Sequence, residues 1–138
     1  MSQVLTEGAQ SASGSTAKIV NVVLWVLQLA AAGMFLMVGF FKLSGNAQLV
    51  GLFKAIGLGQ WFRYLTGTLE VAGAILLLIP RTSGLGALML AGVMVGAVVT
   101  HVFIVGGSPL PATILLVVTS VVAWGRRQRT MNLLTAMR

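Results

Sequence analysis

Two long apolar segments, residues 65–79 and 85–105, follow each other in the chain with only the five-residue turn 80–84 between them. A helix rises about 1.5 Å per residue and a bilayer core is about 30 Å thick, so segments of this kind predict membrane-spanning helices. Of the 138 residues, 57% are hydrophobic and 8% are charged. A soluble domain carries about a quarter charged residues. We therefore expect a single-domain integral membrane protein.

Two further apolar segments complete a bundle. Residues 19–41 form the first span, and residues 110–124 form a short fourth span that ends at Trp124. Between the first two spans, residues 47–56 have apolar side chains at helical spacing but are too few to cross, so we expect a helix at the membrane interface. The predicted fold class is all-α: a four-transmembrane-helix bundle with a short interfacial helix between helices 1 and 2.

The composition also divides the chain along its length. Residues 1–17 are rich in Ser, Gly, Ala and Gln without periodicity and predict a disordered leader. Residues 18–125 form the membrane domain, and residues 126–138 form a basic tail. Four spans place both termini on one side of the membrane. That side carries six cations, Lys18, Arg81, Arg126, Arg127, Arg129 and Arg138. The other side carries three, Lys42, Lys54 and Arg63. This bias predicts cytoplasmic termini.

Composition excludes several classes of function. The chain has no cysteine, which removes disulfides, thiol chemistry, iron–sulfur clusters and thiolate zinc sites. One histidine cannot supply two ligands to a haem, so no metal or haem is expected from this chain alone. The net charge of +7 owes much to the tail, where membrane topology explains it, and no base-stacking motif accompanies it. We expect no nucleic-acid partner.

Each of the two central spans carries one ionisable residue, Glu70 in the first and His101 in the second. Glu70 is the only acid besides Glu7, and His101 is the only histidine. A charge in hydrocarbon is costly, so such groups usually face the bundle interior and pair there. Lys42 and Arg63 lie at the ends of neighbouring spans, where long side chains reach inward. These four residues are the candidates for ligand binding or proton relay, and we expect Glu70 and His101 side by side.

Small and amide side chains mark the expected helix contacts. Gly67 and Gly73 lie on either side of the acid in the second span, and Gly92 and Gly96 are one helical turn apart in the third. Such residues let helix backbones approach closely, so all four are predicted at packing contacts. A phosphate-binding role would require a strand–loop–helix context, which is absent. Gln28, in the first span, is expected to hold helices together by hydrogen bonding.

An ordered series of motifs resembles a known family. The motifs are FFKL at residues 40–43, LGQWFRY at 58–64, TGTLEVAGA at 66–74, LLIPR at 77–81, Thr100-His101, and GSP at 107–109. In this order they resemble the DoxX-like family of bacterial four-helix membrane proteins, over about residues 19–127. The resemblance implies the four-span fold and a location in the bacterial cytoplasmic (inner) membrane.

The family takes its name from a subunit associated with a thiosulfate:quinone oxidoreductase, and other relatives are linked to redox or stress-related membrane complexes. The resemblance therefore implies a subunit of a quinone-linked membrane complex, or a binder of a quinone or lipid-like molecule at the Glu/His cluster. The partners that it implies are the lipid bilayer, other membrane redox subunits or further copies of the chain. It assigns no catalytic residue, and it leaves open whether the protein is an enzyme.

Two other functions remain open. In a non-catalytic assembly or interaction module, Glu70 paired with Lys42, Arg63 or His101 would be a structural clasp that fixes helix register. A proton-coupled carrier is the third function, but four short spans without internal duplication offer little machinery for alternating access. Substitutions at the cluster distinguish the quinone-binding function from the structural clasp. If the pair is a clasp, breaking it should lower the amount of folded protein rather than the activity alone.

Overall fold

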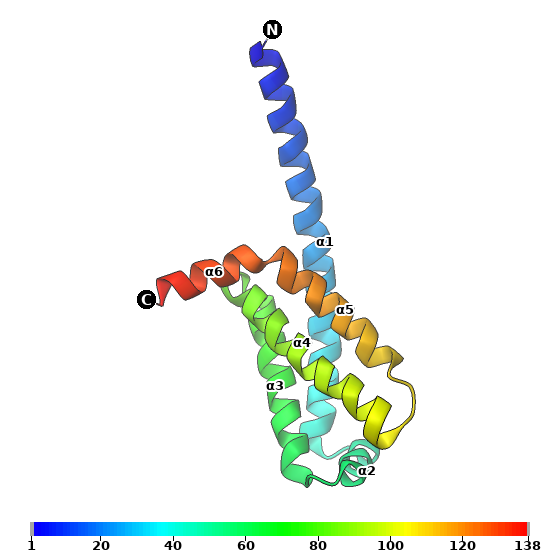
Figure 1. Cartoon of the computed structure of the whole chain (residues 1–138). Helices are drawn as coiled ribbons and strands as arrows, with labels where there is room; N and C mark the ends of the chain where they lie inside the picture. Colours follow the sequence, from blue (N-terminus) through cyan, green and yellow to red (C-terminus); the bar gives the residue numbers. More distant parts are fainter. Residues whose placement is uncertain (1, 138) are drawn as a thin grey trace.

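The computed structural model describes residues 2–137, with side chains from residue 14 onward, and this part of the chain is helical without strands (Figure 1). The elements are α1 (Ser2–Ser44), α2 (Ala47–Ile56), α3 (Gln60–Leu78), η1 (Pro80–Thr82), α4 (Ser83–Thr100), η2 (His101–Val105), α5 (Leu110–Gly125) and α6 (Arg127–Ala136). η1 is a 3₁₀ turn that leads into α4, and η2 is a π-helical turn that extends it. The all-α prediction is confirmed.

Three segments of the described chain are long and apolar enough to cross a membrane: Gly14–Ser44, Gln60–Leu78 and Pro80–Val105. The helices α5 and α6 meet this criterion only as a pair, and the pair is bent by 60°. The structure thus gives three spans, or four if the bent pair counts as one. Residues 47–56 do form the short apolar helix that the sequence predicts.

Local sequence explains where α2 begins and ends. The Asn46 side chain accepts a hydrogen bond of 3.1 Å from the Gln48 amide at the start of the helix. Such a cap satisfies one of the amide groups that the first turn leaves without a helical partner. The helix ends at Gly57, whose φ of 86° lies in the left-handed region that glycine adopts without steric cost.

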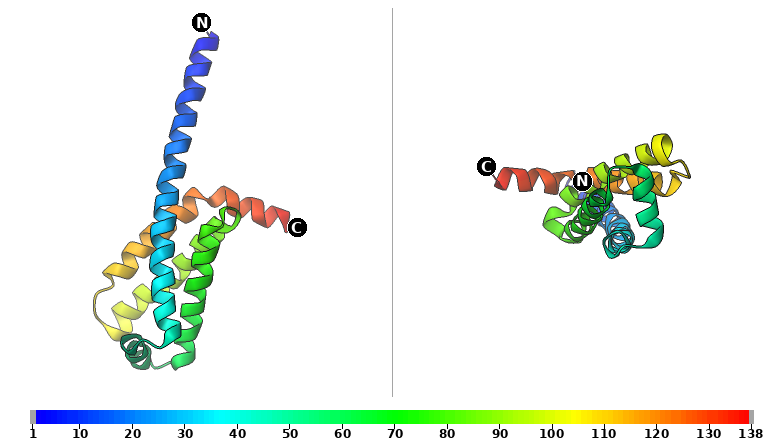
Figure 2. Two further views of the ribbon diagram at one scale, coloured as in Figure 1. Left: turned by 180° about the vertical axis from the view of Figure 1, so that it is seen from behind. Right: turned by 90° about the horizontal axis from the view of Figure 1, so that it is seen from below.

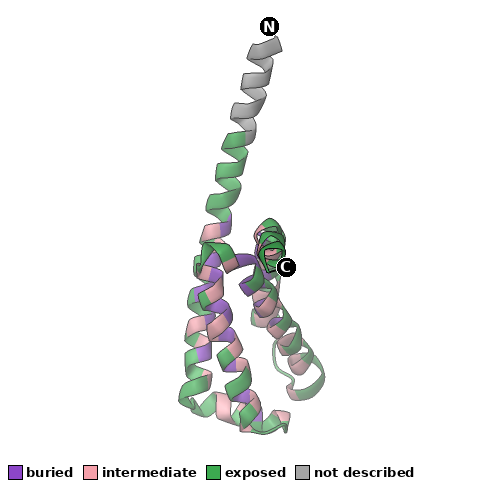
Figure 3. Ribbon diagram, turned by 90° about the vertical axis from the view of Figure 1, so that its left-hand side faces the viewer, coloured by how far each residue is buried: buried purple, intermediate pink, exposed green. Residues whose placement is uncertain are grey.

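The helices pack in chain order. α1 lies along α3, α3 packs on α4, and α4 packs on α5, which also contacts α1 (Figures 1 and 2). α2 crosses one end of the bundle, and both ends of the chain lie on the opposite side (Figure 1). Buried residues concentrate on the facing sides of neighbouring helices (Figure 3). Large apolar side chains such as Val22, Phe103 and Trp124 are exposed, as expected for a surface in contact with lipid.

The predicted leader differs from the structure. α1 begins at Ser2, so the segment expected to be disordered continues the first helix, and the side chains of residues 14–17 are exposed. No proline interrupts the sequence between Ser2 and Ser44. Extending an existing helix adds one hydrogen bond for each residue fixed, without a new nucleation step. The helix therefore continues beyond the residues that the bundle buries.

Candidate functional site

An ion pair joins α1 to α3. The Nζ atom of Lys42 lies 2.5 Å from Oε1 of Glu70 and donates a hydrogen bond to it. The Glu70 side chain is fully buried, and the Lys42 side chain is 12% exposed. It is the one salt bridge found among the described residues. A buried charge is tolerated when it is paired and hydrogen-bonded, so Lys42 explains how an acid fits inside this bundle.

Arg63 supports the same contact from α3. Its side chain is 4% exposed, and one guanidinium N–H donates to the backbone carbonyl of Lys42. That carbonyl belongs to the last turn of α1, where carbonyls lack helical partners. The Arg63 Nε group also donates to Oε1 of Gln60 at 2.7 Å. The guanidinium thus caps α1 and fixes the backbone from which the Lys42 side chain extends.

The short helix α2 is attached to this cluster. The Gln60 side chain donates from Nε2 to the Val50 carbonyl of α2 at 3.1 Å. The Phe53 ring lies 5.5 Å from Lys42 Nζ and 5.8 Å from the ring of Phe62. A cation above an aromatic face is stabilised by the ring quadrupole. Lys42 therefore links α1 to two other helices, to α2 through Phe53 and to α3 through Glu70.

Glycines bring the two helices close enough for this pair. A Cβ atom added at Gly67 would lie 2.9 Å from Lys42 Cβ, and one added at Gly39 would lie 2.7 Å from a methyl group of Val71. Gly73 makes a comparable contact with Leu90 of α4. Gly67 and Gly73 thus occupy close contacts between helices. Gly39 is a third glycine at such a close contact, and the sequence analysis did not predict it.

The third-span glycines behave differently from the prediction. A Cβ atom at Gly92 or Gly96 would meet nothing within 4 Å, and both residues are exposed. Their spacing places them on one face of α4, but none of the described helices covers that face at these two positions. They do not mediate packing within the chain.

His101 does not join the pair. Its Nδ1 atom lies 3.1 Å from the Gly106 carbonyl, and because a carbonyl only accepts, Nδ1 is the donor of that hydrogen bond. The ring is half-buried in η2, which lies beside α2. Among the described residues, no hydrogen bond or ion pair links His101 to Glu70. Glu70 therefore pairs with Lys42 and not with His101 as expected. His101 instead stabilises the turn that follows η2 through its hydrogen bond to Gly106.

One oxygen of the buried carboxylate has no partner. Oε2 of Glu70 makes no hydrogen bond to any residue that the structure describes. It is an acceptor beside a lysine that already binds Oε1. No cluster of three or more His, Cys, Asp or Glu side chains that could hold a metal ion occurs in the described part of the chain.

A second buried polar cluster lies where α5 meets α6. The Nε group of Arg126 donates to Gln28 Oε1 at 2.7 Å, and its Nη1 group donates to Asn21 Oδ1 at 2.9 Å. Arg126 is 6% exposed, although sequence analysis assigned it to the tail. Asn21 and Gln28 are seven residues apart and so share a face of α1, which was the available signal. Two amides on an apolar helix need a polar partner.

Gln28 also satisfies the end of α3. Its Nε2 group donates to the Leu77 carbonyl at 2.9 Å. Pro80 stops α3 and has no N–H, so carbonyls of the last turn lose their helical donors. The Leu76 carbonyl receives the Thr82 hydroxyl at 2.9 Å for the same reason. Gln28 thus holds helices together, as the sequence predicts, by linking α1 to α3 and to Arg126.

The motifs of the site belong to a recognised family of sequences. The family model described as the DoxX-like family matches residues 26–125, well over half of the chain, and includes the Lys42–Glu70 pair and Arg63. A search of curated proteins and one of solved structures gave no match. The chain belongs to the DoxX-like family of membrane proteins.

Proposed function

We propose that this protein is a non-catalytic membrane module, an assembly or interaction subunit, in which Lys42 and Glu70 form a structural clasp. The observation that carries the proposal is the complete burial of Glu70 against a lysine from another helix. Arg63, Phe53 and Gly67 all serve that same contact. A site built for turnover would leave a reactive group accessible to substrate, whereas this carboxylate is enclosed.

The proposed setting is the bacterial inner membrane with four spans and cytoplasmic termini. In this setting α5 supplies the fourth span, the 60° bend before α6 lies at the cytoplasmic membrane surface, and α2 lies at the opposite interface. Both described ends of the chain lie on the side away from α2 (Figure 1), the side to which sequence analysis assigns six of the nine cations. An excess of Lys and Arg on the cytoplasmic side supports this orientation.

A second candidate function is favoured by one observation, the unpartnered Oε2 atom of Glu70. A buried acceptor without a donor is unusual and often marks a functional site. In this alternative the protein binds a quinone or a similar amphipathic molecule as part of a redox complex, and Glu70 accepts a hydrogen bond from its headgroup. Lys42 would then hold the carboxylate in place, and His101 would lie outside the immediate site.

One experiment separates the two functions. The purified full-length chain and its Glu70→Gln variant are heated in detergent, with and without added ubiquinone or menaquinone, and the midpoint of unfolding is measured. For a clasp, neither quinone raises the midpoint of the wild type, and Glu70→Gln lowers the midpoint without any ligand. Lys54→Gln is the matched control, because Lys54 is exposed and unpaired among the described residues.

A different result of the same experiment would support quinone binding. A saturable rise of the wild-type midpoint with quinone, lost in a Glu70→Gln variant that is otherwise as stable as the wild type, would contradict the clasp.

A further inference from the structure

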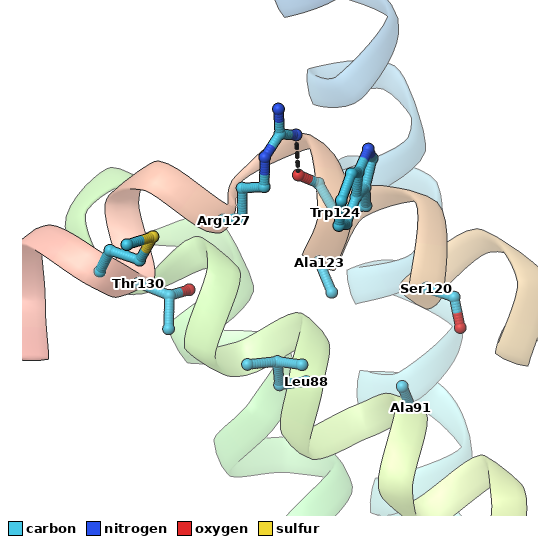
Figure 4. Close-up of a pocket in the computed structure, with 8 residues that line it drawn as sticks. Leu88, Ala91, Ser120, Ala123, Trp124, Arg127 and Thr130 are labelled. Atoms are coloured by element: carbon cyan, nitrogen blue, oxygen red, sulfur yellow. Dashed lines mark hydrogen bonds between the residues drawn. The ribbon is translucent and has the colours of Figure 1, made fainter.

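A groove runs along the outer surface of the bundle between α4 and α5. It has a volume of about 380 Å³, and Figure 4 shows its lining. The lining side chains come from α4, α5 and the first turns of α6: Leu88, Ala91, Ser120, Ala123, Trp124, Arg127, Thr130 and Met131. Small side chains such as Ala91 and Ala123 leave the space, and the 60° bend between α5 and α6 lies at one end. The groove is independent of the Lys42–Glu70 pair.

At the end of the groove beside this bend, the lining includes a positively charged residue, Arg127. Arg127 donates from Nη1 to the Trp124 carbonyl at 2.8 Å, and its guanidinium lies 4.3 Å from the centre of the Trp124 ring (Figure 4). Arg127 is exposed, so the rest of its five N–H groups remain available to a ligand. A tryptophan beside an arginine at the end of an apolar helix is typical of the headgroup level of a membrane.

The cations at this end have no acidic partner among the side chains that the structure describes. Glu70 is the only acid among the residues whose side chains are described, and its ion pair is with Lys42. Arg126 directly precedes Arg127 and Arg129 follows it two residues later, and the hydrogen bonds of both go to neutral groups. None of the described side chains therefore balances the positive charge of this surface, and an anionic ligand would supply that balance.

We infer that the groove binds an anionic phospholipid, with its phosphate on Arg127 and one acyl chain along α4 and α5. The groove is apolar along its length and cationic at one end, which matches the two parts of such a lipid. Arginine pairs well with phosphate because its fork donates two parallel hydrogen bonds. A zwitterionic lipid fits the apolar part equally well but gains less at the charged end.

Lipid retention tests this site. The full-length chain in mild detergent is mixed with equal amounts of phosphatidylglycerol and phosphatidylcholine of identical chains, and the retained lipids are counted by native mass spectrometry. We expect the wild type to favour phosphatidylglycerol about fivefold, which corresponds to the roughly 1 kcal/mol that one cation contributes at an anionic surface. Arg127→Gln should bring this preference close to equality, while Lys54→Gln, at the opposite end, should keep it.

Filling the groove should lower retention of both lipids. Ala91→Phe or Ser120→Leu does this from two different helices, and Val95→Phe, exposed on α4 outside the lining, is the control. Circular dichroism measures the helix content of each variant. If one of the two groove-filling variants has less helix than the wild type, the other one is used. Equal retention of both lipids by the wild type would overturn the inference. So would displacement of lipid by millimolar glycerol phosphate, or dimers that form on this face in place of bound lipid.

Discussion

Lys42 Nζ lies 2.5 Å from Glu70 Oε1, across the contact between α1 and α3. The two residues are 28 positions apart in the chain, so we expect their contact to fix both the register and the rotation of the two helices. It does so inside a bundle whose other contacts are largely apolar and therefore weakly directional. The proposed clasp therefore predicts that the buried ion pair selects one arrangement of this packing.

Adding a methyl group at Gly67 should disturb that arrangement. The new Cβ would lie 2.9 Å from Lys42 Cβ, closer than real Cβ atoms approach, and it would also press on Leu43. We expect Gly67→Ala to lower the free energy of unfolding by about 1–3 kcal/mol, the usual cost of overpacking. Thermal unfolding in detergent measures it.

Gly92→Ala is the matched control, because a Cβ there meets nothing within 4 Å. In an exposed helix, alanine is more favourable than glycine by about 1 kcal/mol, so this variant should be neutral or more stable. Equal destabilisation by both substitutions would contradict the close contact at Gly67.

Removing Arg126 should weaken the end of the bundle where the termini lie. Arg126→Met leaves the buried Gln28 Oε1 without its donor and frees Asn21. An unsatisfied buried polar group costs about 1–3 kcal/mol. Arg81→Met, at an exposed arginine with no hydrogen bond among the described residues, should change stability by less than about 0.5 kcal/mol. Chemical unfolding of the two variants side by side makes the comparison.

His101 and Glu70 should contribute independently to stability. The ring is bonded to the Gly106 carbonyl and the carboxylate to Lys42. Effects of residues without shared partners add within about 0.5 kcal/mol, so His101→Ala and Glu70→Gln should be additive when combined. A coupling free energy well above this value would restore the direct contact that the sequence suggested.

Much of the fold could be predicted because it depends on patterns along the chain. The lengths of the apolar segments predict the helices, and Pro80 and the glycines predict where helices end. The lone acid in the spans indicates a buried polar contact. The choice of partner for Glu70 could not be predicted. Counting residues gives depth along a helix but not which neighbour its face meets, and Lys42, Arg63 and His101 all had suitable depths.

Two further differences have local causes. η2 begins at His101, and a π-helical turn directs side chains differently from the α-helical spacing that the sequence was assumed to follow. Arg126 follows the last apolar segment and therefore resembled the start of a tail. The helix bends immediately after Gly125, where an added Cβ atom would lie 2.7 Å from the Leu24 side chain of α1. The chain is therefore close to α1 at the bend, and Arg126 lies against that helix.

The direct test of the clasp compares Lys42→Met, Glu70→Leu and the double variant by their free energies of unfolding. Lys42→Met alone strands a buried carboxylate and should cost about 3–5 kcal/mol. The double variant replaces the pair by apolar side chains of similar size, so it should regain much of that loss and be more stable than Lys42→Met. A double variant as unstable as the sum of the two single variants would contradict the account.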